Sequence, residues 1–148
     1  MKRQILTLGA AAVAALSVLA VAAVAAVDAV TPGKYKGSLY QANGKPVANA
    51  PVTISVVGKK VTINAPRLPI MCQSPSGKFD TPSPPTKYVF KGTLKGNGVS
   101  GNYIPPLGGT GEYFVAKGSF APATKTFVGK LSFVGRCKGT STVRAKKA

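Results

Sequence analysis

After residue 29 the chain consists of short runs in which apolar and polar residues alternate, and Gly, Pro and Asn separate one run from the next. Alternation with a period of two is typical of β-strands that bury one face, whereas an amphipathic helix repeats every three or four residues. The runs after residue 29 do not have helical spacing. The sequence therefore predicts a single all-β domain over residues 30–148, built as an antiparallel meander.

Eight or nine strands are expected, and they can form either a β-sandwich or a small barrel. Turn residues support hairpins, because Asn43-Gly44, Asn97-Gly98 and Gly58-Lys59 each favour a two-residue connection. Two loops are also expected, at residues 74–86 with polyproline II character and at 104–111. The expected strands are 34–41, 52–57, 60–65, 68–73, 87–95, 99–104, 112–120, 126–136 and 139–145.

A short motif with Lys-Gly followed by Ser or Thr recurs in four of these strands, at residues 35–39, 90–94, 116–120 and 137–141. Strand parity puts the Gly of each copy on the inner face and the Lys on the outer face. An inner Gly makes room for aromatic rings of neighbouring strands or for bends of a curved sheet. The outward lysines of the motif are Lys36, Lys91, Lys117 and Lys138.

Residues 1–29 are predicted to be a secretory signal peptide, because Lys2 and Arg3 precede an uncharged apolar stretch that closes on small residues. Cleavage is expected after Ala29, and Ala23-Val24-Ala25 offers an earlier site. The alternative is an uncleaved signal anchor, since the apolar stretch is long enough to span a bilayer. The protein is therefore expected to be secreted or in the cell envelope, and membrane-anchored if the leader is retained.

The two cysteines, Cys72 and Cys137, fit an exported protein, in which they should form one disulfide. Parity places both thiols on inner faces, so they are expected to meet across the interior. A reactive thiol would need a neighbouring base, and a metal site would need further ligands. The chain has no histidine to supply either.

The charged residues argue against enzyme chemistry. The chain has 20 Lys and Arg, 3 Asp and Glu and no His, for a formal net charge of +17. General acid–base catalysis needs a group that exchanges a proton near neutral pH, which this composition hardly provides. The sequence also lacks nucleophile-elbow, phosphate-loop and metal-ligand motifs. The prediction is a non-enzymatic protein without cofactor or metal.

A strongly basic domain attracts polyanions, so the predicted partner is an anionic cell-wall polymer or a membrane surface. If their strands are neighbours, Lys36, Lys91, Lys117 and Lys138 would form a basic stripe, joined by Arg144, Lys146 and Lys147. Export and the excess of Lys over Arg disfavour nucleic acid. The oligomeric state stays open.

Two further functions are compatible with the sequence. A small-molecule-binding β-barrel would use inner Tyr and Phe residues and the two long loops, and it predicts an interior cavity. A structural envelope component without a discrete ligand predicts a filled core and scattered lysines.

The chain also resembles uncharacterised secreted β-domains of actinobacterial type. The resemblance rests on the opening Gly33-x-Tyr35-x-Gly37, the hairpin at residues 58–61, a mid-chain Cys and the late Gly-x-Cys-x-Gly at residues 135–139. It covers most of residues 33–145 and implies no particular activity.

Overall fold

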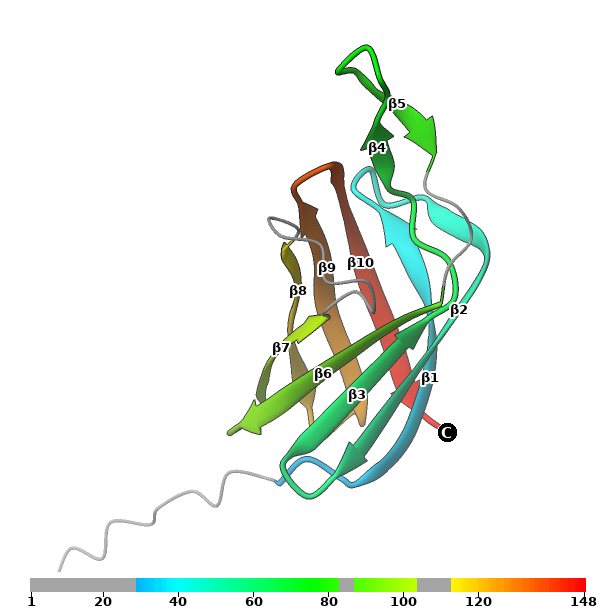
Figure 1. The fold of residues 1–148 in the computed structure, drawn as a ribbon. Helices are drawn as coiled ribbons and strands as arrows, with labels where there is room; N and C mark the ends of the chain where they lie inside the picture. The colour runs from blue at the N-terminus through cyan, green and yellow to red at the C-terminus, as the bar shows by residue number, and fades with distance from the viewer. Residues whose placement is uncertain (1–28, 83–86, 104–112) are drawn as a thin grey trace, which may run out of the picture.

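The computed structural model describes residues 29–82, 87–103 and 113–148, and within them it contains ten β-strands (Figure 1). The predicted leader lies outside the described residues except for Ala29. The described part of the chain has no helix that could cross a membrane. The strands are β1 (Gly33–Gln41), β2 (Pro46–Val57), β3 (Lys60–Ala65), β4 (Met71–Gln73), β5 (Phe79–Pro82), β6 (Tyr88–Lys95), β7 (Gly98–Tyr103), β8 (Tyr113–Ala121), β9 (Thr126–Val134) and β10 (Cys137–Lys147).

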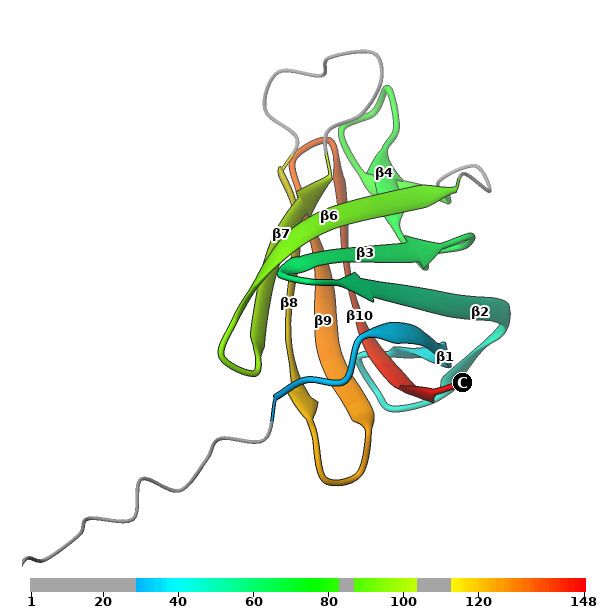
Figure 2. The same cartoon turned by 90° about the horizontal axis from the view of Figure 1, so that it is seen from below.

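Eight of the strands close into an antiparallel barrel (Figure 2). Their order is β1-β2-β3-β6-β7-β8-β9-β10, and β10 pairs with β1 to close it. The remaining strands, β4 and β5, form a hairpin outside the barrel that is attached to the first residues of β10. Of the two architectures that the sequence allowed, the structure has the barrel. Closure leaves no unpaired edge among the eight barrel strands.

The strand predictions hold for most of the barrel, and β3 has the predicted bounds of residues 60–65. One strand was missed, because β5 (Phe79–Pro82) lies inside the segment that its prolines marked as a loop. Proline is tolerated at a sheet edge, and β5 is the edge strand of this sheet. Residues 74–78 of that expected loop form the turn between β4 and β5, whereas its residues 83–86 and the expected loop at 104–111 lie outside the described residues.

The predicted hairpins are present, but two of the turns are centred one residue earlier than expected. Gly58-Lys59 forms the predicted two-residue turn, with Gly58 at φ 56°. The turn between β6 and β7 is centred on Gly96-Asn97, with Gly96 at φ 54°. A positive φ at the first central residue suits the twist of a hairpin, and glycine adopts it at little cost. The first hairpin turns at Ala42-Asn43, where the Gly44 N–H donates to the Gln41 carbonyl.

The barrel interior is filled with aliphatic and aromatic side chains. The largest fully buried ones include Tyr35, Phe90, Phe127, Leu39, Ile54 and Leu131. Aromatic rings meet at tilted or edge angles, with 5.0 Å between the ring centroids of Tyr35 and Phe120 and 4.8 Å between those of Phe120 and Phe127. A second group joins the rings of Tyr88 and Phe133 at 5.4 Å. Such contacts add to the stability that burial provides.

The inner glycines make room for an aromatic ring, as the sequence suggested, and also allow two strands to approach closely. Gly118 and Gly129 face each other across β8 and β9, and the Phe127 ring occupies the space where their side chains would be. Gly92 and Gly101 face each other across β6 and β7, where a Cβ at Gly101 would lie 2.7 Å from the Gly92 Cα. The backbones therefore approach more closely than any other residue would permit.

The segment before β1 packs against one end of the barrel. Val30 is buried in the core, and the Tyr35 hydroxyl donates a hydrogen bond of 2.7 Å to the Thr31 carbonyl. Burial raises the pKa of Tyr35, so this phenol keeps its proton and its donor role. The Lys147 Nζ donates to the Pro32 carbonyl at 3.1 Å. Residues 30–32 are thus part of the folded domain.

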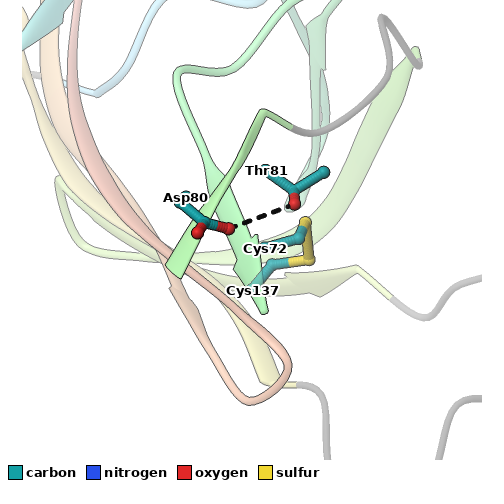
Figure 3. Close-up of a disulfide and its surroundings, with 4 residues drawn as sticks. All are labelled: Cys72, Asp80, Thr81 and Cys137. Atoms are coloured by element: carbon teal, nitrogen blue, oxygen red, sulfur yellow. Dashed lines mark hydrogen bonds between the residues drawn. A yellow bond between two sulfur atoms is a disulfide. The ribbon is translucent and has the colours of Figure 1, made fainter. Parts of the chain in front are cut away.

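Cys72 and Cys137 form the predicted disulfide, but not across the interior (Figure 3). The two residues lie directly opposite each other on the neighbouring strands β4 and β10. The expectation of a bridge across the core was wrong because parity gives the face of a strand and not its neighbour in the sheet. The disulfide instead fastens the outer hairpin to the barrel.

Candidate anion-binding surface

The four lysines of the recurring motif lie on different parts of the barrel. Lys36 is on β1, Lys91 on β6, Lys117 on β8 and Lys138 on β10. Strands without the motif separate β6 from β8 and β8 from β10. Although β1 and β10 are neighbours, Lys138 lies opposite Met71 at one end of β10 and Lys36 lies opposite Lys146 near the other. The structure therefore does not gather these four lysines into one stripe.

A different set of cations does lie together, on the outer face of the four neighbouring strands β8, β9, β10 and β1. Lys117 lies directly opposite Lys130, and Lys36 directly opposite Lys146. Arg144 lies two residues from Lys146 on the same face of β10. We call this set the basic face; its members are Lys36, Lys117, Lys130, Arg144 and Lys146, and all five are exposed.

The sequence named four of these five residues and missed Lys130. Lys130 has the outward parity of its strand, between the buried Gly129 and Leu131, and this was the signal that could have found it. Lys147, which was expected to extend the stripe, instead donates to the Pro32 carbonyl. Lys138 lies away from the basic face, with its Nζ 4.3 Å from the centroid of the Phe79 ring.

The basic face carries charge that no nearby acidic side chain of the described residues neutralises. Like charges directly opposite each other on neighbouring strands are destabilising. Asp80 is the one acidic side chain within the described residues, and it lies on β5 outside the barrel, where it accepts a 3.4 Å hydrogen bond from the Thr81 hydroxyl (Figure 3). The two opposed lysine pairs are therefore a cost to folding that a bound anion would relieve.

A shallow depression of about 420 Å³ lies on the outer surface over β1, β9 and β10. Its lining includes Lys36, Arg144 and Lys146 from the basic face. The Arg144 guanidinium lies over the Tyr40 ring, 4.8 Å from the centroid, which restricts where this long side chain can point. Val128, with 51% of its surface exposed, adds an apolar contact.

A second depression, of about 500 Å³, lies over β6, β7 and β8. Its lining includes two hydroxyl side chains and two lysines, which are Thr93, Ser100, Lys95 and Lys117. Lys117 belongs to both this depression and the basic face, so the basic face extends from one hollow to the other.

The described surface offers a ligand positive charge and hydroxyl groups. Within residues 29–82, 87–103 and 113–148, no three His, Cys, Asp or Glu side chains gather where they could hold a metal ion. Both cysteines are in the disulfide. Burial, with Tyr88 beside it, raises the pKa of Tyr103, which keeps this phenol neutral.

We predict that Lys130→Gln raises the free energy of unfolding by about 0.5 kcal/mol at low salt, because it removes the repulsion from Lys117. Urea unfolding at low and high salt measures the effect, which should shrink as salt screens the charges. Lys91→Gln is the matched control, since Lys91 faces the neutral residues Thr62 and Asn102. Equal changes in the two variants would show that the opposed pair is not destabilising.

No protein-family model matches the chain, and a search of curated proteins finds no relative. The resemblance to secreted actinobacterial domains therefore stays a prediction.

Proposed function

We propose that the chain is a non-enzymatic protein, secreted or attached to the cell envelope, that binds an anionic envelope component through the basic face. One observation carries the proposal: five exposed cations share four neighbouring strands, and four of them form directly opposed pairs. No acidic side chain of the described residues lies among them. Clustered positive charges that no acidic side chain compensates attract a polyanion.

The binding should be multivalent and sensitive to salt. Each exposed charge pair contributes little in water, so affinity must come from several contacts made together. A polymer or a membrane surface presents many anions at once and supplies such contacts, whereas a single small anion does not. Nucleic acid is a weaker candidate, because the aromatic rings of the described residues lie mostly inside the barrel and cannot stack on bases.

The proposed location follows from the disulfide and the leader. A disulfide is retained in oxidising compartments, and Cys72 and Cys137 are joined. The apolar stretch before residue 29 is the predicted export signal. Wall polymers and anionic lipid headgroups are the polyanions that an exported protein meets first.

A second candidate is a structural envelope component without a discrete ligand. The packed aromatic core and the lysines that lie away from the basic face, such as Lys91 and Lys138, favour it. The same buried core of aliphatic and aromatic side chains favours a filled interior over the cavity that a small-molecule-binding barrel would need.

The test is binding of the purified protein to anionic vesicles, anionic wall polymer and DNA, each over a salt series. The triple variant Lys36→Glu, Lys130→Glu, Lys146→Glu should lower affinity for the true partner about tenfold or more near physiological salt. A matched triple, Lys45→Glu, Lys59→Glu, Lys78→Glu, changes the net charge equally at exposed positions away from the basic face. Its affinity should stay within about threefold of the unmodified protein.

Equal losses in the two triple variants would mean that net charge alone attracts the partner. The absence of saturable binding to all three partners would favour the structural component. Either result would reject the basic face as a binding site.

A further inference from the structure

Six outward-facing residues, one on each of six neighbouring strands, form a series in which each residue lies directly opposite the next. The register pairs Thr93 with Ser100, Ser100 with Lys117 and Lys117 with Lys130. It continues from Lys130 to Thr142 and from Thr142 to Tyr40. We call these residues the cross-strand row: Thr93, Ser100, Lys117, Lys130, Thr142 and Tyr40.

The cross-strand row joins the two surface depressions. Thr93, Ser100 and Lys117 line the hollow over β6 to β8, and Tyr40 lines the hollow over β1, β9 and β10. Neighbouring strands lie about 4.8 Å apart, so the row measures roughly 24 Å along the outer surface. This is the length of a short oligomer rather than of one small ligand.

Every member of the row carries a hydroxyl or an ammonium group, and none carries an acid. Hydroxyls both donate and accept hydrogen bonds, whereas ammonium groups only donate and prefer anionic oxygens. The row itself has two ammonium groups over this length, and Lys60 lies opposite Thr93 at its end. A polymer with an anion on every unit and no hydroxyls would place many of its charges beside neutral groups.

Arg144 adds an anchor at one end. Arg144 pairs with Ser38 on β1, and its guanidinium lies over the Tyr40 ring. A guanidinium can hold a phosphate through two parallel hydrogen bonds, which a lysine cannot. Stacking on the ring reduces the freedom that Arg144 would lose on binding.

We propose that the cross-strand row binds a linear, phosphodiester-linked polyol chain that lies across the strands with a phosphate on Arg144. The inference rests on the proposed function and names the chemistry of its partner. Ammonium groups pair with the spaced phosphates, and the hydroxyls of the row exchange hydrogen bonds with the polyol units between them.

The first measurement compares poly(glycerol phosphate) with inorganic polyphosphate of the same total charge, by titration calorimetry with the unmodified protein near physiological salt. Poly(glycerol phosphate) should bind at least fivefold more tightly, because only it offers hydroxyl partners to the row. Its affinity should rise with chain length and then level off once the oligomer spans the row. Polyglutamate of equal charge should bind more weakly than either phosphate polymer.

The second measurement removes hydroxyls from the row. The double variant Ser100→Ala, Thr142→Val should lower affinity for poly(glycerol phosphate) about tenfold and leave that for polyphosphate within about twofold. The control double variant Ser55→Ala, Thr62→Val removes an opposed Ser–Thr pair from the outer face of β2 and β3, away from the row. It should change neither affinity.

The outcomes separate this inference from the proposed function. Equal affinity for the two phosphate polymers, or no dependence on oligomer length, would overturn the row as a polyol phosphate site and leave anion binding by the basic face intact. Binding of polyglutamate as tight as that of poly(glycerol phosphate) would overturn the assignment of phosphate. A lack of saturable binding to any of the three polymers would overturn the inference, and the same lack with anionic vesicles would overturn the proposed function as well.

Discussion

Replacing Gly37 by alanine is expected to lower the free energy of unfolding by about 3 kcal/mol or more, and the melting temperature by roughly 10 °C. Gly37 lies opposite Ala145 where β1 pairs with β10, the pairing that closes the barrel. A Cβ at Gly37 would overlap the Arg144 carbonyl oxygen and lie 2.5 Å from the Ala145 Cα. These are backbone atoms, so no side-chain rotation can relieve the overlap.

Relief requires β1 and β10 to separate, and this would open the barrel. Opening exposes the unpaired edges of two long strands, so the variant should also aggregate more readily on heating. The measurement is thermal and urea unfolding followed by far-ultraviolet circular dichroism. Light scattering during the thermal scan would report the aggregation.

Gly98→Ala is the matched control for this prediction. Gly98 is also a strand residue, but a Cβ there would meet only the Lys95 carbonyl oxygen, at the ordinary contact distance of 3.4 Å. Its φ lies outside the left-handed region. A change within about 1 kcal/mol is expected. If the Gly37 and Gly98 variants melt within a few degrees of each other, the close backbone approach at the β1–β10 pairing is not what stabilises closure.

The sequence predicted which residues face inward because alternation encodes the face of a strand directly. The buried Phe127, Leu131 and Phe133 of β9 follow that pattern without exception. Closure of the barrel could not be predicted in the same way. It depends on pairing between β1 and β10, which lie at opposite ends of the domain, and on the absence of a side chain at Gly37 that would keep them apart.

Prediction of the surface sites from the sequence is limited in the same way. Parity correctly placed Lys36 and Lys117 on the outer face, but it contains no information on which strands are neighbours. Lys130 completes an opposed pair with Lys117 only because β8 and β9 are adjacent in that register. The cross-strand row likewise appears only when the registers of five strand pairs are combined, and no sequence motif marks it.

Replacing both cysteines by serine is expected to lower the free energy of unfolding by roughly 4 kcal/mol, the value of the chain-entropy model for a loop of this size. Cys72 and Cys137 are 65 positions apart, so the bridge restricts much of the unfolded chain. Urea unfolding of the double variant measures the loss. Met71→Ser is a suitable control, because Met71 neighbours the bridge on β4 and is already 40% exposed.

The loss of unfolding free energy should reach its full size only if the hairpin β4–β5 and the barrel unfold together. The structure indicates that the hairpin can unfold separately. Apart from the disulfide, the hairpin pairs with β10 through one further residue pair, Met71 with Lys138, and the Lys138 Nζ also lies 4.3 Å from the centroid of the Phe79 ring on β5. A 2.7 Å hydrogen bond from the Gln73 N–H to the Arg136 carbonyl lies beside it. Without the bridge, the hairpin can separate while the eight barrel strands keep their pairing.

Hydrogen exchange distinguishes these two forms of unfolding. In the double cysteine variant, amides of β4 and β5 should exchange rapidly under native conditions, whereas those of β9 and β10 beyond residue 140 should stay protected. Uniform loss of protection across the hairpin and the barrel would contradict this expectation. It would mean that the disulfide stabilises the barrel itself, so that the outer hairpin and the β1–β10 closure unfold as one cooperative unit.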